Sequence, residues 1–338
     1  MPSFSTGKIP SEVLRQVVFS RLGASSERIL CGPAVGEDAA VIDMGDKVLV
    51  AKANPVTAAV GHVGWLTVHI NANDVASRGA RPLWFLCTIM LPEASDETLL
   101  EEIMEDIDEA CCEVGASLVG GHTECTPGLD RPIISGVMIG ETKKGRYVTT
   151  RSAEPDDEIL LTKGAGLEGT AILATDFEER LRGKLDEKTI KAAQSMFRQI
   201  SIVPEALEAV ESRGVSSMHT PTEGGVIQGL WEVARAANVG LEVQEESILV
   251  EPETKKVCEA LGVDPLRLLS SGALIITAKP RKGQEIIGVL SRIGVKAKII
   301  GKVTNAENGM VILKHGGSKT KIKPVKQDEL YRIIDESS

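Results

Sequence analysis

Apolar side chains recur at two different spacings along the chain, and these spacings predict its helices and strands. Between Ser95 and Val114 apolar residues return every three or four positions, as on one face of an α-helix, and Gly115 follows where that helix should end. The same spacing predicts helices at Ser11–Leu22, with Ser11 as its cap, and at Trp65–Ser77. A short apolar run at Trp84–Met90 predicts a buried strand.

A polar turn divides this pattern into two parts. Pro155-Asp156-Asp157 interrupts the apolar pattern, so we place a domain boundary there, between residues 1–152 and residues 153–338. Beyond the turn, short strands alternate with helices, one of which spans Glu223–Asn238 and is closed by Gly240. Strands and helices alternate in both parts, which predicts an α/β or α+β fold with two domains.

Composition narrows the functional classes. The 338 residues carry a formal charge of -10, which argues against nucleic acid and anionic membrane as general partners. No apolar run approaches the ~20 residues of a membrane-spanning helix, and the start of the chain has no signal-peptide core, so we expect a cytoplasmic protein. The six cysteines have no zinc-ligand or disulfide spacing, and we interpret them as reduced and mostly buried thiols.

Two polar interruptions suit a bound cation. Glu37 and Asp38 are adjacent carboxylates in a loop flanked by glycine and alanine, where a hard cation finds oxygen ligands without bulk, although a solvated acidic turn has the same composition. Asn71, Asn73 and Asp74 interrupt an otherwise apolar segment. A buried carboxylate without partners is costly, so Asp74 should be capped, paired or metal-bound, and a helix-capping Asp at a loop is the structural alternative to a metal ligand.

Three glycine-rich stretches carry further candidates. GGHTE at 120–124 follows a predicted strand, where α/β sites usually lie, although a lone residue such as His122 is more often structural. HTPTEGG at 219–225 opens a helix, whose free N–H groups attract anions, although Thr220 also suits ordinary capping. GAGLEG at 164–169 is a GxGxxG that we interpret as a phosphate- or substrate-facing loop, because it does not open a first βαβ unit as an NAD fingerprint does.

Seven stretches, in this order, resemble the motifs of one superfamily. From about Thr6 to Lys314 the chain resembles the aminoimidazole-ribonucleotide synthetase (PurM-like) superfamily, in its AIR synthase-related and HypE-like branch. The stretches are GKIPSEVLRQVV, GPAVGEDAAVID, NANDVASRGARP, VGGHTE, KGAGLEGTAILA, HTPTEGG and DPLRLLSSGALIIT. The resemblance implies an N-terminal ATP-binding domain that pairs with a second copy into a dimeric β-barrel, and a C-terminal α/β sandwich. It also implies ATP and Mg²⁺ as cofactors, and phosphoryl transfer to an amide or carbonyl oxygen of an unidentified small-molecule or protein substrate.

The resemblance also implies roles for individual residues. Those expected to bind metal are Asp38, Asp74 and Glu124. Those expected to bind the nucleotide or its phosphates are Lys52, Asn54, Asn71, Asn73, Thr220 and Gly224. Those expected to act in catalysis are His122, Glu124 and Glu223.

The chain departs from the family pattern where relatives carry acids. Asn54 stands in the Thr-Asp-Pro motif of relatives, and Thr220 stands in their His-Asp-Pro-Thr motif. HypE proteins end in a cysteine that carries a carbamoyl group, whereas no cysteine follows Cys258 here. An ATP-dependent enzyme is therefore our first hypothesis. A nucleotide-binding paralogue with weakened catalysis, or a scaffold of a maturation complex, remains as the alternative.

Overall fold

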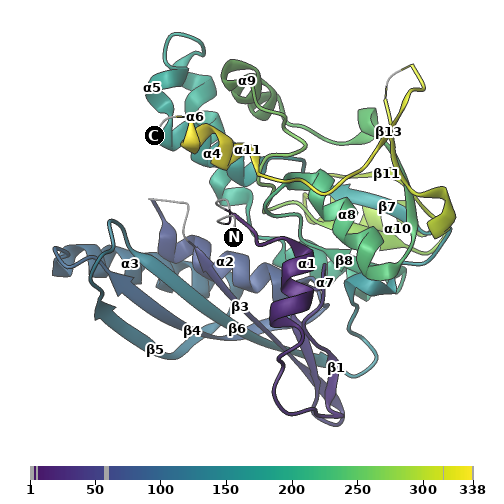
Figure 1. The fold of residues 1–338 in the computed structure, drawn as a ribbon, viewed down its shortest axis with the longest axis horizontal. Helices are drawn as coiled ribbons and strands as arrows, with labels where there is room; N and C mark the ends of the chain where they lie inside the picture. The colour runs from purple at the N-terminus through teal and green to yellow at the C-terminus, as the bar shows by residue number, and fades with distance from the viewer. Residues whose placement is uncertain (1–3, 5–6, 57–60, 315, 337–338) are drawn as a thin grey trace. The chain divides into compact units, whose positions relative to one another are not determined.

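The computed structural model describes residues 4, 7–56, 61–314 and 316–336 (Figure 1). These residues divide into two compact units. Residues 28–32 and 38–147 form what we call the N-terminal unit. Residues 1–27, 33–37 and 148–338 form what we call the C-terminal unit, which therefore includes the start of the chain.

An open six-stranded sheet forms the N-terminal unit, in the order β1-β2-β3-β6-β4-β5. Its strands are β1 (Ile29–Cys31), β2 (Ala40–Asp43), β3 (Lys47–Val56), β4 (Arg81–Leu91), β5 (Ser117–Cys125) and β6 (Ile133–Lys143). Buried positions alternate with half-buried ones along most of β6, as expected when one face of a sheet packs on a core. Among the described strand pairs of this sheet, the β4–β5 pair alone is parallel, and such a pair requires a long crossover connection.

Two helices pack together on one face of this sheet, α2 (Val63–Ala76) and α3 (Glu97–Val114) (Figure 1). Helix α3 is the crossover between β4 and β5. The Asp96 carboxylate caps it by accepting from the backbone N–H of Leu99 at 3.0 Å, and Gly115 ends it in the left-handed conformation, as predicted. Helix α2 is buried on almost all sides, so its polar side chains lie inside the unit.

A seven-stranded sheet forms the centre of the C-terminal unit, in the order β13-β12-β9-β11-β7-β10-β8. Its strands are β7 (Glu158–Thr162), β8 (Val215–His219), β9 (Gly240–Gln244), β10 (Ile275–Ala278), β11 (Ala297–Thr304), β12 (Met310–Leu313) and β13 (Lys319–Lys321). Its helices are α1 (Ser11–Val13), α4 (Leu167–Asp176), α5 (Glu178–Leu181), α6 (Glu187–Ser195), α7 (Val203–Glu211), α8 (Gly225–Ala237), α9 (Pro252–Leu261), α10 (Gly283–Arg292) and α11 (Glu329–Asp335). The apolar stripe of α8, including Val226 and Leu230, belongs to the same core as Ile159 and Leu161 of β7. The two-domain mixed α/β prediction is confirmed.

The first predicted helix is shorter than its apolar spacing suggested. Helix α1 continues as a π-helix only to Val18, and Pro10 rather than Ser11 occupies its N-cap. The side chains of Val17 and Leu22 are 53% and 55% exposed. Apolar spacing therefore predicted a helix here, but its apolar face does not pack on a core.

Two other boundaries also differ from the prediction. GGHTE lies within β5 and not beyond its end, because residues 117–125 pair with β4 along the whole strand. Helix α8 ends at Asn238 in the left-handed conformation, two residues before Gly240 begins β9. Asparagine tolerates this conformation and replaces glycine as the helix terminator.

Most of the cysteine side chains lie in the interior of the protein. The side chains of Cys31, Cys87, Cys111 and Cys258 are buried and form no disulfide, so most of the six cysteines are buried, as predicted. Among the described residues we find no helix with both the length and the apolarity that crossing a membrane requires.

Candidate functional site

Helix α2 carries three of the predicted site residues into the interior of the N-terminal unit. Asn71, Asn73 and Asp74 are at most 3% exposed, although they interrupt an otherwise apolar helix. The helix is apolar around most of its circumference, so folding buries its polar positions together with the rest. A buried carboxylate costs free energy unless a cation or hydrogen-bond donors surround it.

Strand β3 supplies the partners of Asp74. The Lys52 ammonium lies 2.9 Å from Asp74 Oδ2, and the Asn54 amide donates to the same oxygen at 3.2 Å. The Asn71 amide donates to the backbone carbonyls of Asn54 at 3.1 Å and Thr67 at 2.8 Å. Its own Oδ1 is buried and has no hydrogen-bond partner among the described residues. The structure thus brings together four predicted site residues, which we call the Asp74 cluster: Lys52, Asn54, Asn71 and Asp74.

Asp38 is neutralised by an arginine that sequence reasoning did not single out. The Arg78 guanidinium, fully buried, donates to Asp38 Oδ2 at 2.7 Å, and the Ser77 hydroxyl donates to the same oxygen at 3.0 Å. Ser77 also donates to the backbone carbonyl of Asp74, which places Asp38 near the end of α2. The sequence contained one sign of this ion pair, an arginine four residues after Asp74 in an apolar segment. A charge that is buried with such a segment needs a partner of opposite charge.

His122 and Glu124 lie on a different part of the same sheet. Both are exposed on β5, where His122 Nε2 is 3.1 Å from Glu124 Oε2. The hydrogen bond from His122, followed by that from Thr126, lowers the pKa of the Glu124 carboxyl. Strands β6 and β4 separate β3 from β5, a distance of roughly 14 Å at ordinary strand spacing. Within one chain the structure does not bring Glu124 to the Asp74 cluster.

In the C-terminal unit, the residues before α8 form a second polar cluster. His219 Nε2 lies 2.9 Å from Glu232 Oε2, and Thr220 next to it is buried. The Lys8 ammonium donates to the Thr222 hydroxyl at 3.0 Å and lies 3.6 Å from Glu232 Oε1. Burial alone would raise the pKa of Glu232, but the charge of Lys8 and the contact with His219 outweigh it and hold that pKa at about 2. Lys8 and Glu232 are functional candidates that sequence reasoning missed.

The backbone at the start of α8 is already engaged by a carboxylate. Gly224 and Gly225 both have left-handed φ angles, 81° and 65°, and a Cβ at Gly225 would lie 2.6 Å from the Leu266 carbonyl oxygen. The N–H of Gly224, predicted to meet a phosphate, donates to Asp328 Oδ2 at 2.5 Å. Asp328 also accepts from the backbone N–H of Leu330 at 2.8 Å, so it joins α11 to the start of α8.

A group of acids surrounds this junction. Burial, together with the nearby charges of Glu223 and Asp328, raises the pKa of Glu168 to about 7. Burial likewise raises the pKa of Asp328 to about 6. The Tyr331 hydroxyl donates to Glu223 Oε1 at 3.2 Å. Glu168 lies in the first turn of α4, which the GAGLEG segment opens, so the GAGLEG and HTPTEGG segments contribute to one acidic cluster of the C-terminal unit.

Replacing Glu168 by glutamine is expected to stabilise the protein at pH 8 by about 1–3 kcal/mol and to leave stability near pH 4.5 unchanged. The raised pKa means that the native state holds a proton that the unfolded chain releases above pH 4.5. Wild-type stability from this group therefore falls as pH rises from about 4.5 to 7. Urea unfolding across this pH range measures the difference. The exposed substitution Glu307→Gln should follow the wild type, and a Glu168→Gln difference that does not vary with pH would contradict the expectation.

Comparison with known proteins matches both units. The family model "AIR synthase related protein, N-terminal domain" matches residues 36–142, and "AIR synthase related protein, C-terminal domain" matches residues 154–314. A putative hydrogenase expression/formation protein of Methanocaldococcus jannaschii is 27% identical over 90% of this chain and 91% of its own length. The carbamoyl dehydratase HypE of Azotobacter vinelandii is 30% identical over 77% of this chain and 75% of its own length. A crystal structure of the hydrogenase maturation protein HypE in complex with ATP has the same fold, with a TM-score of 0.71, 21% identity and 98% of each chain covered.

Proposed function

Since this chain belongs to the AIR synthase-related family, we propose that it is an enzyme that transfers a phosphoryl group from ATP to an amide or carbonyl oxygen of its substrate. The observation that carries the proposal is the Asp74 cluster, a buried carboxylate with a lysine and two amides around it. A nucleotide with its cation requires this combination of an acid and a phosphate-binding lysine. The carbamoyl dehydratase name of one relative and the ATP bound by a HypE of the same fold support the choice of reaction and nucleotide.

The residues of the Asp74 cluster fit a magnesium ion. Mg²⁺ prefers oxygen ligands and in nucleotide sites is held by one or two carboxylates, with water and phosphate completing its shell. Asp74 offers the carboxylate, and the buried, unpartnered Oδ1 of Asn71 offers a neutral oxygen one helical turn away. We propose that these two side chains hold the ion, beside Asn54 and Asn73. When bound, Mg²⁺ neutralises charge on the phosphate oxygens.

The remaining residues are assigned by the chemistry they offer. Lys52 is half-buried and already faces Asp74, so its ammonium is suited to donate to a phosphate oxygen that approaches the same carboxylate. In the C-terminal unit, we propose that Glu223, at the start of α8, faces the acceptor substrate and acts in catalysis. We propose that Thr220 contacts the nucleotide or its phosphates. Gly224 contributes backbone geometry there, since its N–H is held by Asp328.

Calorimetric titration with ATP in the presence of Mg²⁺ tests the proposal. We expect binding that is lost when Mg²⁺ is chelated, accompanied by slow ATP turnover when no acceptor is present. Absence of ATP binding at millimolar nucleotide would overturn the proposal.

A nucleotide-binding paralogue with weakened catalysis is the second candidate. It is favoured by Asn54, which donates an amide hydrogen to Asp74 where a second carboxylate would offer an oxygen. Restoring acids in Asn54→Asp with Thr220→Asp should then raise ATP turnover above that of the parent. Unchanged turnover in this double variant counts against weakened catalysis.

We also propose that the N-terminal unit dimerises through β5. All nine residues of this edge strand are exposed, and the side chains of Leu118 and Val119 are 41% and 53% exposed. Exposed apolar edge strands invite pairing with another chain. Light scattering should give the mass of two chains, and Val119→Lys should shift it toward one. A wild-type monomer would contradict the dimer.

A further inference from the structure

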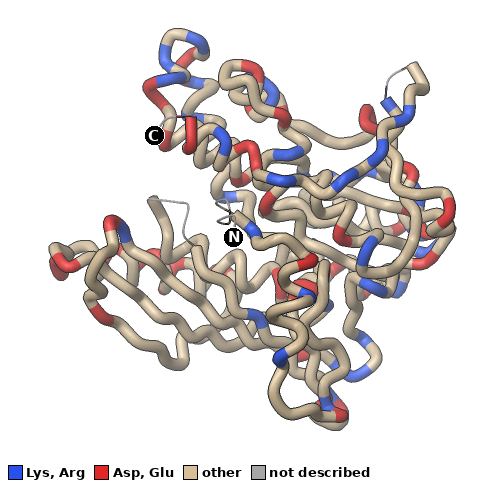
Figure 2. The backbone as a smooth tube through the Cα atoms, in the orientation of Figure 1, with Lys and Arg blue, Asp and Glu red and all other residues tan. Residues whose placement is uncertain are grey.

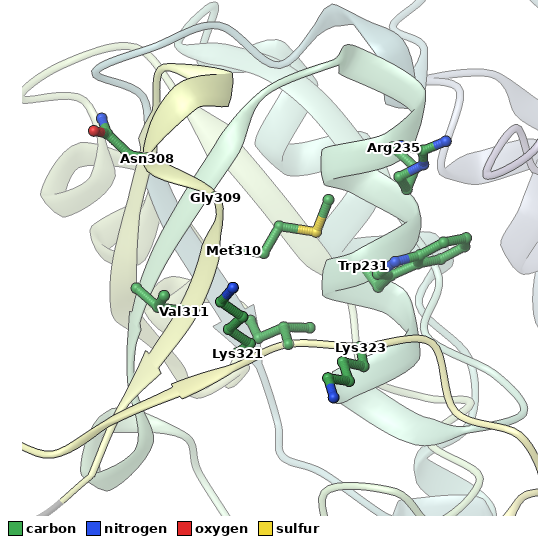
Figure 3. A pocket seen from close by; sticks show the side chains of 9 residues that line it. Trp231, Arg235, Asn308, Gly309, Met310, Val311, Lys321 and Lys323 are labelled. Carbon is green, nitrogen blue, oxygen red and sulfur yellow. The ribbon is translucent and has the colours of Figure 1, made fainter.

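A hollow of about 280 Å³ lies at one edge of the sheet in the C-terminal unit (Figure 3). Three segments line it: helix α8, the turn into β12, and β13 with the residues that follow it. None of its lining residues belongs to the Asp74 cluster or to the acidic cluster around Glu168. The family resemblance assigns no role to these lining residues, and the side chains of the hollow indicate what it could bind.

The body of the hollow is apolar. Trp231 of α8 and Met310 of β12 line it (Figure 3), together with Ile322. Trp231 and Met310 are only partly buried, whereas Ile322 is 7% exposed. Ligand sites commonly combine such an apolar wall with a few polar groups at the rim, and a volume near 300 Å³ suits a small ligand.

The rim of the hollow is positively charged. Arg235, Lys321 and Lys323 line it, and no aspartate or glutamate does. The segment 309–327 contains five lysines and no acid, in a chain whose formal charge is -10 (Figure 2). Neighbouring lysines of this segment are paired with acids, Lys319 with Glu242 and Lys314 with Glu245. Within the described residues, no ion pair involves Lys321 or Lys323.

Protection of an edge strand explains only part of this arrangement. Lysines on an edge strand discourage pairing with other chains, and β13 is an edge strand. That role accounts for Lys321 but not for Arg235, which comes from α8 and lies 5.8 Å from the centre of the Trp231 ring. It also leaves unexplained the apolar wall between the cations. Three cations from two segments line one apolar hollow, which is the arrangement expected of a binding site.

We propose that this hollow binds a small organic anion. Its aromatic or branched aliphatic body lies against Trp231 and Met310, and its carboxylate or phosphate is held by Lys321, Lys323 and Arg235. Cations at the rim stay hydrated until the anion arrives, and the apolar wall then excludes water from one side of the contact. This site is additional to the proposed ATP-dependent activity and does not depend on it.

Phenylacetate and phenyl phosphate are the probes, with phenylacetamide as the neutral counterpart. Ligand-observed NMR and the fluorescence of Trp231 follow their binding to the full-length protein. For probes of this size we expect dissociation constants of roughly 1 mM for the anions. The neutral amide should bind at least about tenfold more weakly, and Trp231→Phe should remove the fluorescence response that accompanies anion binding.

A charge-matched pair of variants decides the role of the rim. Lys321→Gln with Lys323→Gln should weaken binding of both anions at least about tenfold. Lys314→Gln with Lys326→Gln removes the same charge from the same segment outside the hollow, and it should change binding by less than about twofold. The proposal fails if neither anion binds, if the amide binds equally well, or if the two double variants behave alike. Thermal unfolding of both variants verifies that each remains folded.

Discussion

Replacing Asp74 by asparagine is expected to lower Mg²⁺-dependent ATP turnover at least about 100-fold. The side chain keeps its shape but loses the charge that faces Lys52 at 2.9 Å and that we propose holds the metal ion. A neutral amide oxygen binds Mg²⁺ more weakly than a carboxylate does. The Mg²⁺ concentration needed for half-maximal turnover should rise as well, since the affinity for the ion falls.

Steady-state ATP turnover, measured as a function of Mg²⁺ concentration, tests this effect. If turnover is too low to follow, calorimetry measures the affinity for ATP in the presence of Mg²⁺ instead. Asp43→Asn is the matched control. It removes the same charge and breaks an ion pair of similar length, 2.7 Å to Lys144, on the exposed surface of the same unit. The control should behave like the wild type. Turnover of Asp74→Asn within about twofold of wild type would remove Asp74 from the site.

Replacing Arg78 by methionine is expected to lower the free energy of unfolding by about 3–5 kcal/mol. The guanidinium is fully buried, and its loss leaves the Asp38 carboxylate, only 7% exposed, without the cation at 2.7 Å. Removing one partner of a buried ion pair costs more than removing both, because the remaining charge stays desolvated. The double variant Arg78→Met with Asp38→Asn should therefore recover part of the loss.

Urea unfolding measures both variants. Lys144→Met breaks an exposed ion pair with Asp43 and should lower the free energy of unfolding far less, which separates burial from charge pairing as the cause. A cost of the same small size for Arg78→Met would show that Asp38 keeps its charge without Arg78. The result also bears on function. If Asp38 is needed mainly for stability, its variants should unfold at lower urea concentrations than the wild type. Their ATP turnover per folded molecule should stay the same.

The elements that local sequence predicted best are those whose ends depend on near neighbours. Helix α3 begins at the Asp96 cap and stops at Gly115, because capping and left-handed backbone involve residues within one turn. Strand β5 was only partly predicted. Its GGHTE segment has no apolar alternation, and it extends because β4 offers a hydrogen-bonding edge. Tertiary pairing thus overrode a weak local signal.

In the candidate site, too, residues that stand out within one segment could be predicted, whereas their partners from distant segments could not. Asn71 and Asp74 could be predicted because polar residues within an apolar helix are conspicuous in the sequence. Arg78 and Asp328 were not predicted as partners, because Arg78 lies 40 residues from Asp38 and Asp328 lies 104 residues from Gly224. Which of several cations or amides meets a given acid depends on packing that a sequence pattern does not encode.

By itself, the sequence determined that this protein has two mixed α/β units and that one acid and two amides lie in the apolar helix α2. The spacing of apolar residues, and the burial that it predicts, can be recognised within one segment of the sequence. Only the tertiary structure decided that Lys52 neutralises Asp74, that Arg78 neutralises Asp38, and that Glu124 lies on a distant strand. The physical reason is distance: electrostatic partners act within a few ångströms, and strand order decides which residues come that close.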